Sequence, residues 1–268
     1  MKINSMAQVY TMRECKCSDL VIAAHHDDIE IMCPHGIIAC KDSTDKGLVA
    51  VIVSDGAGSP RTGAYANFTD EEMKLARIEE QKRAAELGNY AALLLLKHSS
   101  ATIKDKGCTI PTDDLEAIIL KYNPDTIHIH NLADKHPTHV ACAVRSIQAI
   151  RRLPIELRPA KLYGCEVWRG LDWLSDKDKV VFDLTGQEQF LKSLLSVFET
   201  QVAGCKRYDI AAEGRRVANA TYSSSHAVDI CTSAAYAMDL TLLIQNDNID
   251  PRDYIMSKID DFKSEILI

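Results

Sequence analysis

The chain has 268 residues, which is enough for one α/β domain with a sizeable core. Its apolar content of 46% and charged content of 26% are those of an ordinary globular protein, and its net charge of −7 argues against nucleic acid or an anionic membrane as the main partner. No run approaches the roughly 18 apolar residues of a membrane span, and we expect no secretory signal at the polar N-terminus.

The first half of the chain alternates strand-like and helix-like segments. The apolar run 20–24 predicts a buried strand, and residues 31–39 predict a buried helix. A capping box from Thr69 to Glu72 predicts the start of a helix that closes at Gly88. The other elements predicted here are strands over 47–54 and 91–96 and a helix that begins at 112.

The second half continues the alternation. It predicts strands over 126–130, 162–168 and 180–184 and helices over 139–151 and 187–208, and residues 211–268 are not assigned. Strands that alternate with helices imply a mostly parallel sheet with helices on both faces. We interpret residues 18–268 as a single domain that follows an N-terminal extension, 1–17.

Two polar clusters follow two of these strands. His25-His26-Asp27-Asp28 comes directly after the strand 20–24, and His136-Pro137-Thr138-His139 comes shortly after the strand 126–130. Ligands of parallel sheets bind at the carboxyl ends of the strands, so we expect the two clusters to meet. Imidazole and carboxylate groups together suit zinc or ferrous iron.

The residue types suggest separate roles. His25, Asp28 and His139 would make a three-ligand metal site that keeps one position open, as catalytic sites do. Asp27 would take a proton from a water activated by the metal. His136 would stabilise an oxyanion or protonate a leaving amine. These are the parts needed to hydrolyse an amide.

Each cluster has a plainer interpretation when it is taken alone. A His-His-Asp-Asp sequence is typical of a polar loop or helix cap, and histidines three apart on a helix are commonly surface or core residues. The conjunction of two clusters, each after a buried strand, favours the metal site. His128 and His130 are expected to be buried and hydrogen-bonded, and Trp168 is expected to pack in the core or at a rim.

The number and spacing of the cysteines indicate the cellular compartment. The nine cysteines are odd in number and include no Cys-x-x-Cys pair. We therefore expect reduced thiols and a cytoplasmic protein.

The motifs resemble those of a known family. Residues 24–30, Ala-His-His-Asp-Asp-Ile-Glu, resemble the AHPDDxE motif of the PIG-L/LmbE-like zinc deacetylases, and residues 136–139 resemble their second motif, HPDH. Arg77-Ile-Glu-Glu80 with the later Leu87-Gly88 resembles the family's helix motif, and residues 207–222 resemble a block found in some bacterial members.

The resemblance implies a Rossmann-like α/β fold and removal of acetyl groups from N-acetylglucosamine-type sugars or their conjugates. It assigns His25, Asp28 and His139 to zinc, Asp27 to the general base, His136 to the oxyanion or acid role, and Arg77 to a substrate contact. It also implies a possible homo-oligomer, because members often form trimers or hexamers.

Three departures from the family pattern affect the site. His26 replaces a proline and adds an imidazole that could compete for metal. Thr138 replaces the aspartate of HPDH and should support the imidazolium of His136 less well. Cys33-Pro34-His35-Gly36 stands where the family has a glycine-rich segment and is expected to reshape the pocket floor.

Two alternative functions stay open. One is an amidase that acts on a thiol conjugate or another non-sugar amide. The other is a metal- or sugar-binding protein without turnover.

Overall fold

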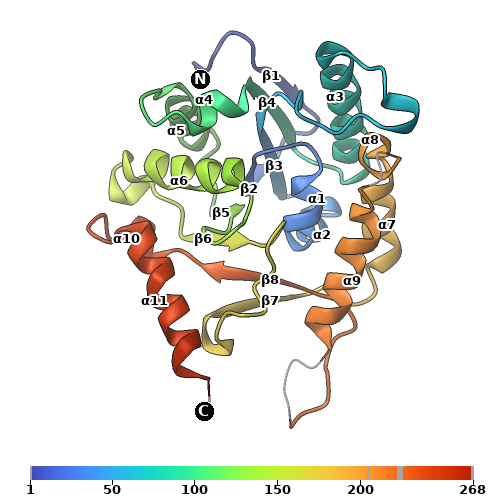
Figure 1. Cartoon of the computed structure of the whole chain (residues 1–268). Coiled ribbons are helices and arrows are strands. Elements are labelled where there is room, and N and C mark those ends of the chain that lie inside the picture. Colours follow the sequence, from blue (N-terminus) through green and yellow to red (C-terminus); the bar gives the residue numbers. More distant parts are fainter. Residues whose placement is uncertain (1, 204–205, 222–225, 267–268) are drawn as a thin grey trace.

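The computed structural model describes residues 2–203, 206–221 and 226–266, so Tyr222, at the end of the motif block 207–222, lies outside the described residues. Its centre is a single sheet (Figure 1). The strands in chain order are β1 Gln8–Thr11, β2 Lys16–Ala23, β3 Lys46–Ser54, β4 Ala92–His98, β5 Thr126–His130, β6 Lys161–Cys165, β7 Lys179–Asp183 and β8 Ala234–Asp239.

The sheet has the order β1-β4-β3-β2-β5-β6-β8-β7. The five strands from β4 to β6 pair in parallel, whereas β1, β8 and β7 pair antiparallel with their neighbours. The predicted α/β fold with a mostly parallel sheet is confirmed. β2 and β5 are neighbours in the middle of the sheet, which brings the ends of both cluster-bearing strands together.

Helices cover both faces of the sheet (Figure 1). One buried apolar cluster joins the sheet to α4, α5, α6, α10 and α11, and a second joins it to α1, α2, α3 and α7. The helices are α1 Asp28–Met32, α2 Pro34–Lys41, α3 Asp70–Leu87, α4 Ser100–Lys104, α5 Ile110–Tyr122, α6 Pro137–Arg151, α7 Glu188–Ser196, α8 Glu199–Val202, α9 Tyr208–Ala220, α10 Leu242–Gln245 and α11 Pro251–Ser264. Among these helices, none is both long and apolar enough to cross a bilayer.

Two predicted helices are interrupted. The segment 31–39 is divided between α1 and α2 because Cys33 leaves the helical region, with φ −127° and ψ 44°. Pro34 follows it, and a proline disfavours helical geometry in the residue before it. The segment 187–208 is divided between α7, α8 and the start of α9, because Phe198 turns out of the helix to bury its ring in the core.

Helix α3 begins with the predicted capping box. The Thr69 hydroxyl accepts a hydrogen bond from the Glu72 amide at 3.3 Å, and the Glu72 carboxylate accepts one from the Thr69 amide at 2.8 Å. The box fixes where α3 starts and therefore which of its residues face the sheet. Arg77 and Gln81 are among the buried residues of this helix, and both reach the end of β2.

The N-terminal residues lie against the sheet. Strand β1 adds an antiparallel edge to β4. Before it, Asn4 donates to Asp114 through its backbone amide at 2.9 Å and its side chain at 2.7 Å. His98 lies 2.8 Å from the same carboxylate. These contacts tie the first residues of the chain to β4 and α5.

Candidate active site

The site begins where β2 and β5 end. The Ala24 carbonyl accepts a hydrogen bond from the Ser54 amide at 2.9 Å, which ties the end of β2 to β3. The Ala24 amide donates to Nε2 of His130, also at 2.9 Å, which ties it to β5. The turn that follows β2 therefore starts from a fixed point. The two predicted clusters are brought to the same edge of the sheet, as the sequence indicated.

The turn itself contains a left-handed residue. Asp27 has φ 81°, a region that aspartate tolerates better than most residues do. Its amide donates to Gln81 Oε1 at 3.1 Å, and the Gln81 amide group donates to Glu30 at 2.8 Å. Such strained residues persist where the surroundings hold them, and they gather at functional sites. The turn leads directly into α1, whose first residue is Asp28.

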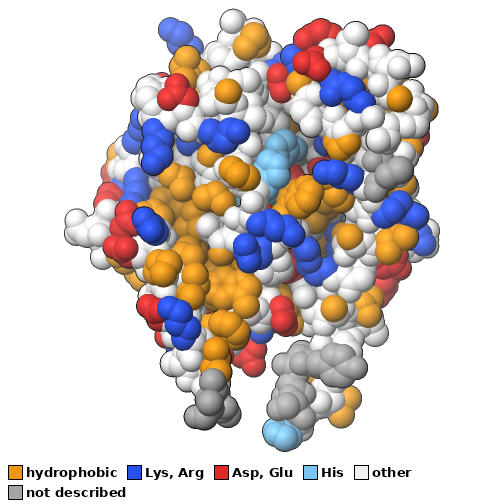
Figure 2. All heavy atoms as spheres, in the orientation of Figure 1, with side chains coloured by type: hydrophobic (Ala, Val, Ile, Leu, Met, Phe, Trp, Pro, Cys, Tyr) orange, Lys and Arg blue, Asp and Glu red, His pale blue; other side chains and the backbone are white. Residues whose placement is uncertain are grey.

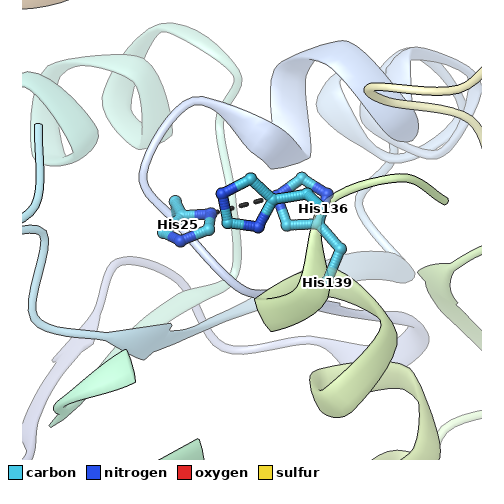
Figure 3. Close-up of side chains that lie close together, drawn as sticks. All are labelled: His25, His136 and His139. Carbon is cyan, nitrogen blue, oxygen red and sulfur yellow. Dashed lines mark hydrogen bonds between the residues drawn. The ribbon is translucent and has the colours of Figure 1, made fainter. Parts of the chain in front are cut away.

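His25, Asp28 and His139 converge on one point. Nδ1 of His25 lies 3.0 Å from Nε2 of His139, and each of these nitrogens lies 3.3 Å from Oδ2 of Asp28. Figure 3 shows His25, His136 and His139 close together beside α6, with the contact between His25 and His139 dashed. The structure therefore brings together the three residues that the sequence predicts as metal ligands. Their role as ligands remains a prediction.

The geometry of this trio fits a zinc ion. Zn–N and Zn–O bonds of about 2.0–2.2 Å at tetrahedral angles separate adjacent ligand atoms by roughly 3.3–3.5 Å. The three observed separations are 3.0–3.3 Å. Two imidazole nitrogens and a carboxylate oxygen are also donors that zinc and ferrous iron accept. Two imidazole nitrogens at 3.0 Å need a proton or a cation between them, and a divalent ion meets that need for the whole trio.

Two other histidines lie beside the trio. Nε2 of His130 is 3.4 Å from Asp28, but its lone pair already accepts the hydrogen bond from the Ala24 amide. The ring of His136 is 4.9 Å from that of His25 and lines the cavity. His130 is thus occupied as a structural acceptor, whereas His136 is placed to meet a substrate.

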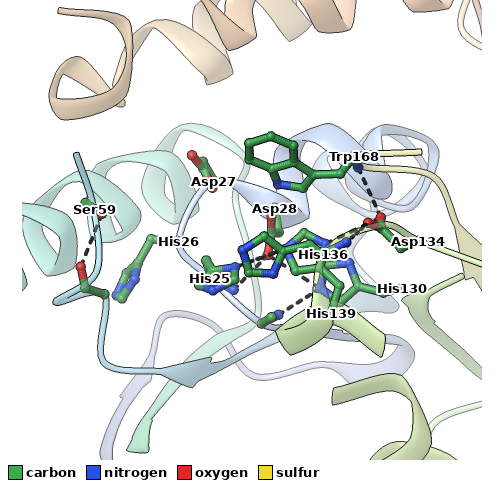
Figure 4. A network of polar contacts seen from close by, with 12 residues as sticks. His25, His26, Asp27, Asp28, Ser59, His130, Asp134, His136, His139 and Trp168 are labelled. Atoms are coloured by element: carbon green, nitrogen blue, oxygen red, sulfur yellow. Dashed lines mark hydrogen bonds and ion pairs between the residues drawn. The ribbon is translucent and has the colours of Figure 1, made fainter. Parts of the chain in front are cut away.

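Asp134 supports His139 from behind. Its Oδ2 lies 3.5 Å from Nδ1 of His139 and accepts a hydrogen bond from the Trp168 amide at 3.1 Å (Figure 4). Its Oδ1 accepts from the His136 amide at 2.9 Å. A carboxylate on one ring nitrogen directs the lone pair of the other toward a metal. Asp134 was not among the residues predicted for the site, although it lies only two residues before His136.

The charges at the trio suit cation binding. Burial lowers the pKa of His139 to about 4, which keeps the ring neutral and its Nε2 lone pair available. Burial alone would raise the pKa of Asp28, but His139 and His130 beside it hold that pKa well below the usual range. Asp28 is therefore favoured as an anion, as a metal ligand should be.

Asp27 differs from Asp28. Burial raises the pKa of Asp27 well above the usual range, although the nearby Arg77 guanidinium acts in the opposite direction. The ion pair between Arg77 Nη2 and Asp27 Oδ1 measures 3.4 Å. Oδ2 of Asp27 has no hydrogen-bond partner among the described residues, and Asp27 lines the cavity. A carboxylate with one free oxygen and a raised pKa can take a proton from a reacting group.

Arg77 is more enclosed than a simple substrate contact would be. Its guanidinium donates to the His26 carbonyl and, at 2.7 Å, to the Ser59 hydroxyl. Together with the ion pair to Asp27, these bonds leave its side chain 3% exposed. The structure therefore places Arg77 at the cavity wall, where it holds Asp27 and the loop after β3.

A cavity of about 500 Å³ opens above the trio. This volume is typical of a small-molecule site. Figure 2 shows a histidine in the hollow at the middle of this face, with lysine and arginine side chains around it. The basic residues that line the cavity are Arg77, Lys104, Lys135, Lys206 and Arg215.

The mouth of the cavity has an aromatic wall. The Lys206 ammonium lies 4.7 Å from the centroid of the Trp168 ring, and the Tyr208 ring meets Trp168 edge-on at 6.0 Å. Trp168 also lies 5.8 Å from His136. The expectation that Trp168 packs at a rim is therefore confirmed, and the rim is that of the cavity. Tyr208 belongs to the block 207–222 that resembles the family, and Lys206 directly precedes that block; neither residue was predicted as part of the site.

The departures from the family motifs have structural consequences. His26 is 1% exposed, and neither of its ring nitrogens has a hydrogen-bond partner among the described residues. It packs against Gly56, where an added Cβ would lie 3.0 Å from its Nδ1, and it belongs to none of the possible metal-binding groups found there. Thr138 is buried, and Nδ1 of His136 has no hydrogen-bond partner among the described residues. The burial of His136 itself lowers the pKa of that ring.

Comparison with known proteins gives a family match and several similar folds. The model of the PIG-L family, described as GlcNAc-PI de-N-acetylase, matches residues 20–150. A search of curated protein sequences finds no match.

The solved structures share the fold at low identity. N,N'-diacetylchitobiose deacetylase from Pyrococcus horikoshii is 16% identical, with a TM-score of 0.66 over 85% of each chain. The A40926 pseudoaglycone deacetylase Dbv21 is 14% identical, with a TM-score of 0.60 over 84% of this chain and 97% of its own. GalB, a 4-carboxy-2-hydroxymuconate hydratase from Pseudomonas putida, is 17% identical, with a TM-score of 0.60 over 84% and 96%. At these identities the likeness shows the fold alone.

Proposed function

We propose that this chain, whose residues 20–150 match the PIG-L family of de-N-acetylases, is a metal-dependent hydrolase that removes an N-acetyl group from an amino sugar or its conjugate. The observation that carries the proposal is the convergence of His25, Asp28 and His139 beneath a cavity that Asp27 and His136 also line. We further propose zinc as the metal, with iron as the next candidate, and the cytoplasm as the compartment.

The residues divide the work of amide hydrolysis. A divalent ion bound by the trio would supply Lewis-acid chemistry, which makes water more acidic and polarises a carbonyl. Asp27 would accept a proton from the attacking water through its unpartnered Oδ2. The oxygen of that water would bond to the acetyl carbon and leave an oxyanion on the former carbonyl oxygen. The carbon–nitrogen bond would then break, the nitrogen would take up the proton that Asp27 accepted, and acetate and a free amine would leave.

His136 would act on the substrate from the opposite side of the trio. Its ring is 4.9 Å from His25 and 4.5 Å from His139, and it borders the cavity (Figure 3). Because burial lowers its pKa, it would serve mainly as a neutral hydrogen-bond donor to the developing oxyanion. Thr138, where the family has an aspartate, adds no negative charge to oppose this.

The cavity mouth suits a sugar. The indole of Trp168 provides an apolar face at the rim, and lysine side chains lie beside it. A flat aromatic face with nearby polar groups binds a ring that has both an apolar side and hydroxyl groups. The sugar and whatever it is attached to are left for the assay to identify.

The direct test is release of a primary amine from N-acetylglucosamine and its glycosides. Asp27→Asn should lower turnover by roughly 10²–10⁴-fold, as loss of a general base does, while the metal content stays unchanged. Asp113→Asn, which alters a surface carboxylate paired with Arg152, is the control and should leave turnover unchanged. Near-normal activity in Asp27→Asn would exclude the proposed base.

A second candidate has a specific observation in its favour. The cavity mouth carries Lys104, Lys135, Lys206 and Arg215, and none of these cations has a carboxylate partner among the ion pairs of the described residues. A mouth of this kind suits a carboxylate substrate, and a hydratase of an unsaturated acid shares the fold. Loss of the ultraviolet absorbance of such an acid, with no amine released from any acetylated sugar or thiol conjugate, would favour hydration. Metal binding without either reaction would favour a binding protein.

A further inference from the structure

A second group of metal-ligand side chains lies outside the active-site trio. Cys33, His35 and His128 place one sulfur and two nitrogens within 4.8 Å of one another. Cys33 and His35 flank the start of α2, whereas His128 lies in the middle of β5. None of the three lines the active-site cavity. The proposed reaction therefore leaves this group unexplained.

The separations in this group match a metal site. Sγ of Cys33 lies 3.7 Å from Nε2 of His35, and that nitrogen lies 3.3 Å from Nδ1 of His128. With a Zn–S bond of about 2.3 Å and Zn–N bonds of about 2.0–2.1 Å, tetrahedral angles give roughly 3.5–3.6 Å and 3.3–3.4 Å for these two pairs. Two of the three ligand-atom pairs thus lie at nearly the distances that a shared ion would require, and the third pair lies within 4.8 Å.

A carboxylate sets the direction of His128. Asp19 Oδ1 lies 2.9 Å from Nε2 of His128. A carboxylate oxygen is an acceptor, so Nε2–H of His128 is the donor in this contact. The Nδ1 lone pair is then left facing His35 and Cys33. Metal-binding histidines in proteins are commonly held by a carboxylate in this way.

The space for the sulfur depends on a glycine. A Cβ added at Gly36 would come within 2.6 Å of Cys33 Sγ and 3.9 Å of His128 Nε2. A larger residue would displace the thiol from the group. Aromatic rings cover the other side, because Phe182 stacks on His35 at 3.5 Å between centroids and Tyr163 packs beside both Phe182 and His128. The group is thus enclosed, as structural metal sites are.

We propose that Cys33, His35 and His128 bind a second ion, a thiophilic divalent transition metal such as Zn²⁺. Thiolate and imidazole donors select such ions over magnesium or calcium. Cys33 loses its proton on binding, and Asp19 keeps His128 in the tautomer that binds. The ion joins the corner between α1 and α2 to β5. Binding of the ion would fasten the end of α1, the helix that begins with Asp28, to the sheet.

An ordinary hydrogen-bonded core is the competing interpretation. His35 Nε2–H can donate to His128 Nδ1 at 3.3 Å with no ion present. That arrangement uses Nε2 of His35 as a donor and leaves its buried Nδ1 as an acceptor with no partner among the described residues. The two interpretations differ in whether the Cys33 thiol ever becomes a thiolate ligand.

Cobalt substitution distinguishes them. The full chain is stripped of metal, titrated with Co²⁺ and followed by absorption spectroscopy. The proposal expects two ions per chain and a near-ultraviolet sulfur-to-cobalt charge-transfer band, which the all-nitrogen-and-oxygen active site cannot produce. One ion with no such band in the wild type would overturn the proposal without any variant.

Variants of single residues show which side chains give rise to the charge-transfer band. Cys33→Ser should abolish the charge-transfer band and lower the stoichiometry to one ion. Cys40→Ser, a matched change at another buried cysteine of α2, should keep both. His139→Ala should keep the band and lose the other ion, so failure of this site and failure of the active-site trio are separately visible. A band that persists in Cys33→Ser, or in His35→Asn if the first variant does not fold, would contradict the proposed ligands.

Discussion

Arg77 Nη2 lies 3.4 Å from Asp27 Oδ1, and both side chains are almost completely buried at the wall of the cavity. The pair joins α3 to the turn after β2. Because one guanidinium bonds to Asp27, the His26 carbonyl and the Ser59 hydroxyl, Arg77 fixes the position of the proposed base. The sequence resemblance implies a substrate contact for Arg77, and the geometry gives it a positioning role as well.

Arg77→Lys should therefore lower kcat more than it changes KM. A lysine keeps the charge, but its single ammonium group cannot replace the several hydrogen bonds that a planar guanidinium donates in fixed directions. Asp27 would therefore lose its fixed position. We expect a fall in kcat of about tenfold or more, since small misplacements of a catalytic group are costly. Steady-state kinetics on whichever acetylated sugar is turned over measures this. A large rise in KM with kcat unchanged would instead assign Arg77 to substrate binding.

Asp134→Asn should weaken metal binding while the fold is kept. The variant removes the negative charge 3.5 Å from Nδ1 of His139, and loss of such a partner typically reduces metal affinity by about 10–100-fold. Competition with a chromophoric chelator measures the affinity. Asp125→Asn, at an exposed pair with Lys16, is the control. Equal affinities for Asp134→Asn and the wild type would show that Asp134 does not support the ligand.

Asp114→Asn should destabilise the protein in a pH-dependent way. Burial alone would raise the pKa of Asp114, but hydrogen bonds from His98 and Asn4 lower it below its unfolded value of about 3.9. The unfolded state then binds more protons at acidic pH, so this stabilisation is present above about pH 4 and is lost as the pH falls through the lower folded pKa.

Urea unfolding of both proteins tests this expectation. At pH 7 the variant should be less stable by about 2 kcal/mol, the usual cost of losing hydrogen bonds to a buried charge. The difference between the two proteins should shrink as the pH approaches 3. A difference that is constant over that range would show that the charge of Asp114 is not the cause.

Periodicity and strand chemistry predicted the centre of this fold. The strand 126–130 was predicted with the bounds of β5, and the strand 47–54 differs from β3 by one residue, because each is a short apolar run between clear breaks. The boundaries of helices were harder to predict than those of strands. Within residues 31–39, Pro34 was the local signal that Cys33 would leave the helix. The order of the last two strands, β8 before β7, depends on packing between distant segments and had no local signal.

In the site, too, some residues could be predicted from the sequence and others could not. His25, Asp28 and His139 were predictable because their residue types and their places after strands both pointed to one edge. The partners of these residues were not. Gln81 reaches Asp27 from a helix more than fifty positions away, and Lys206 reaches Trp168 from the segment before α9. Contacts of this kind depend on how helices lie against the sheet, which no pattern within a single segment records.

The central claim, that His25, Asp28 and His139 hold a metal that the protein uses for hydrolysis, is tested most directly by elemental analysis paired with an amine-release assay. Wild type and His139→Ala are compared, each before and after zinc or iron is added, with N-acetylglucosamine derivatives as substrates. The account predicts that His139→Ala loses one ion per chain together with amine release. An unchanged metal content in His139→Ala, or amine release that persists in it, would contradict the claim.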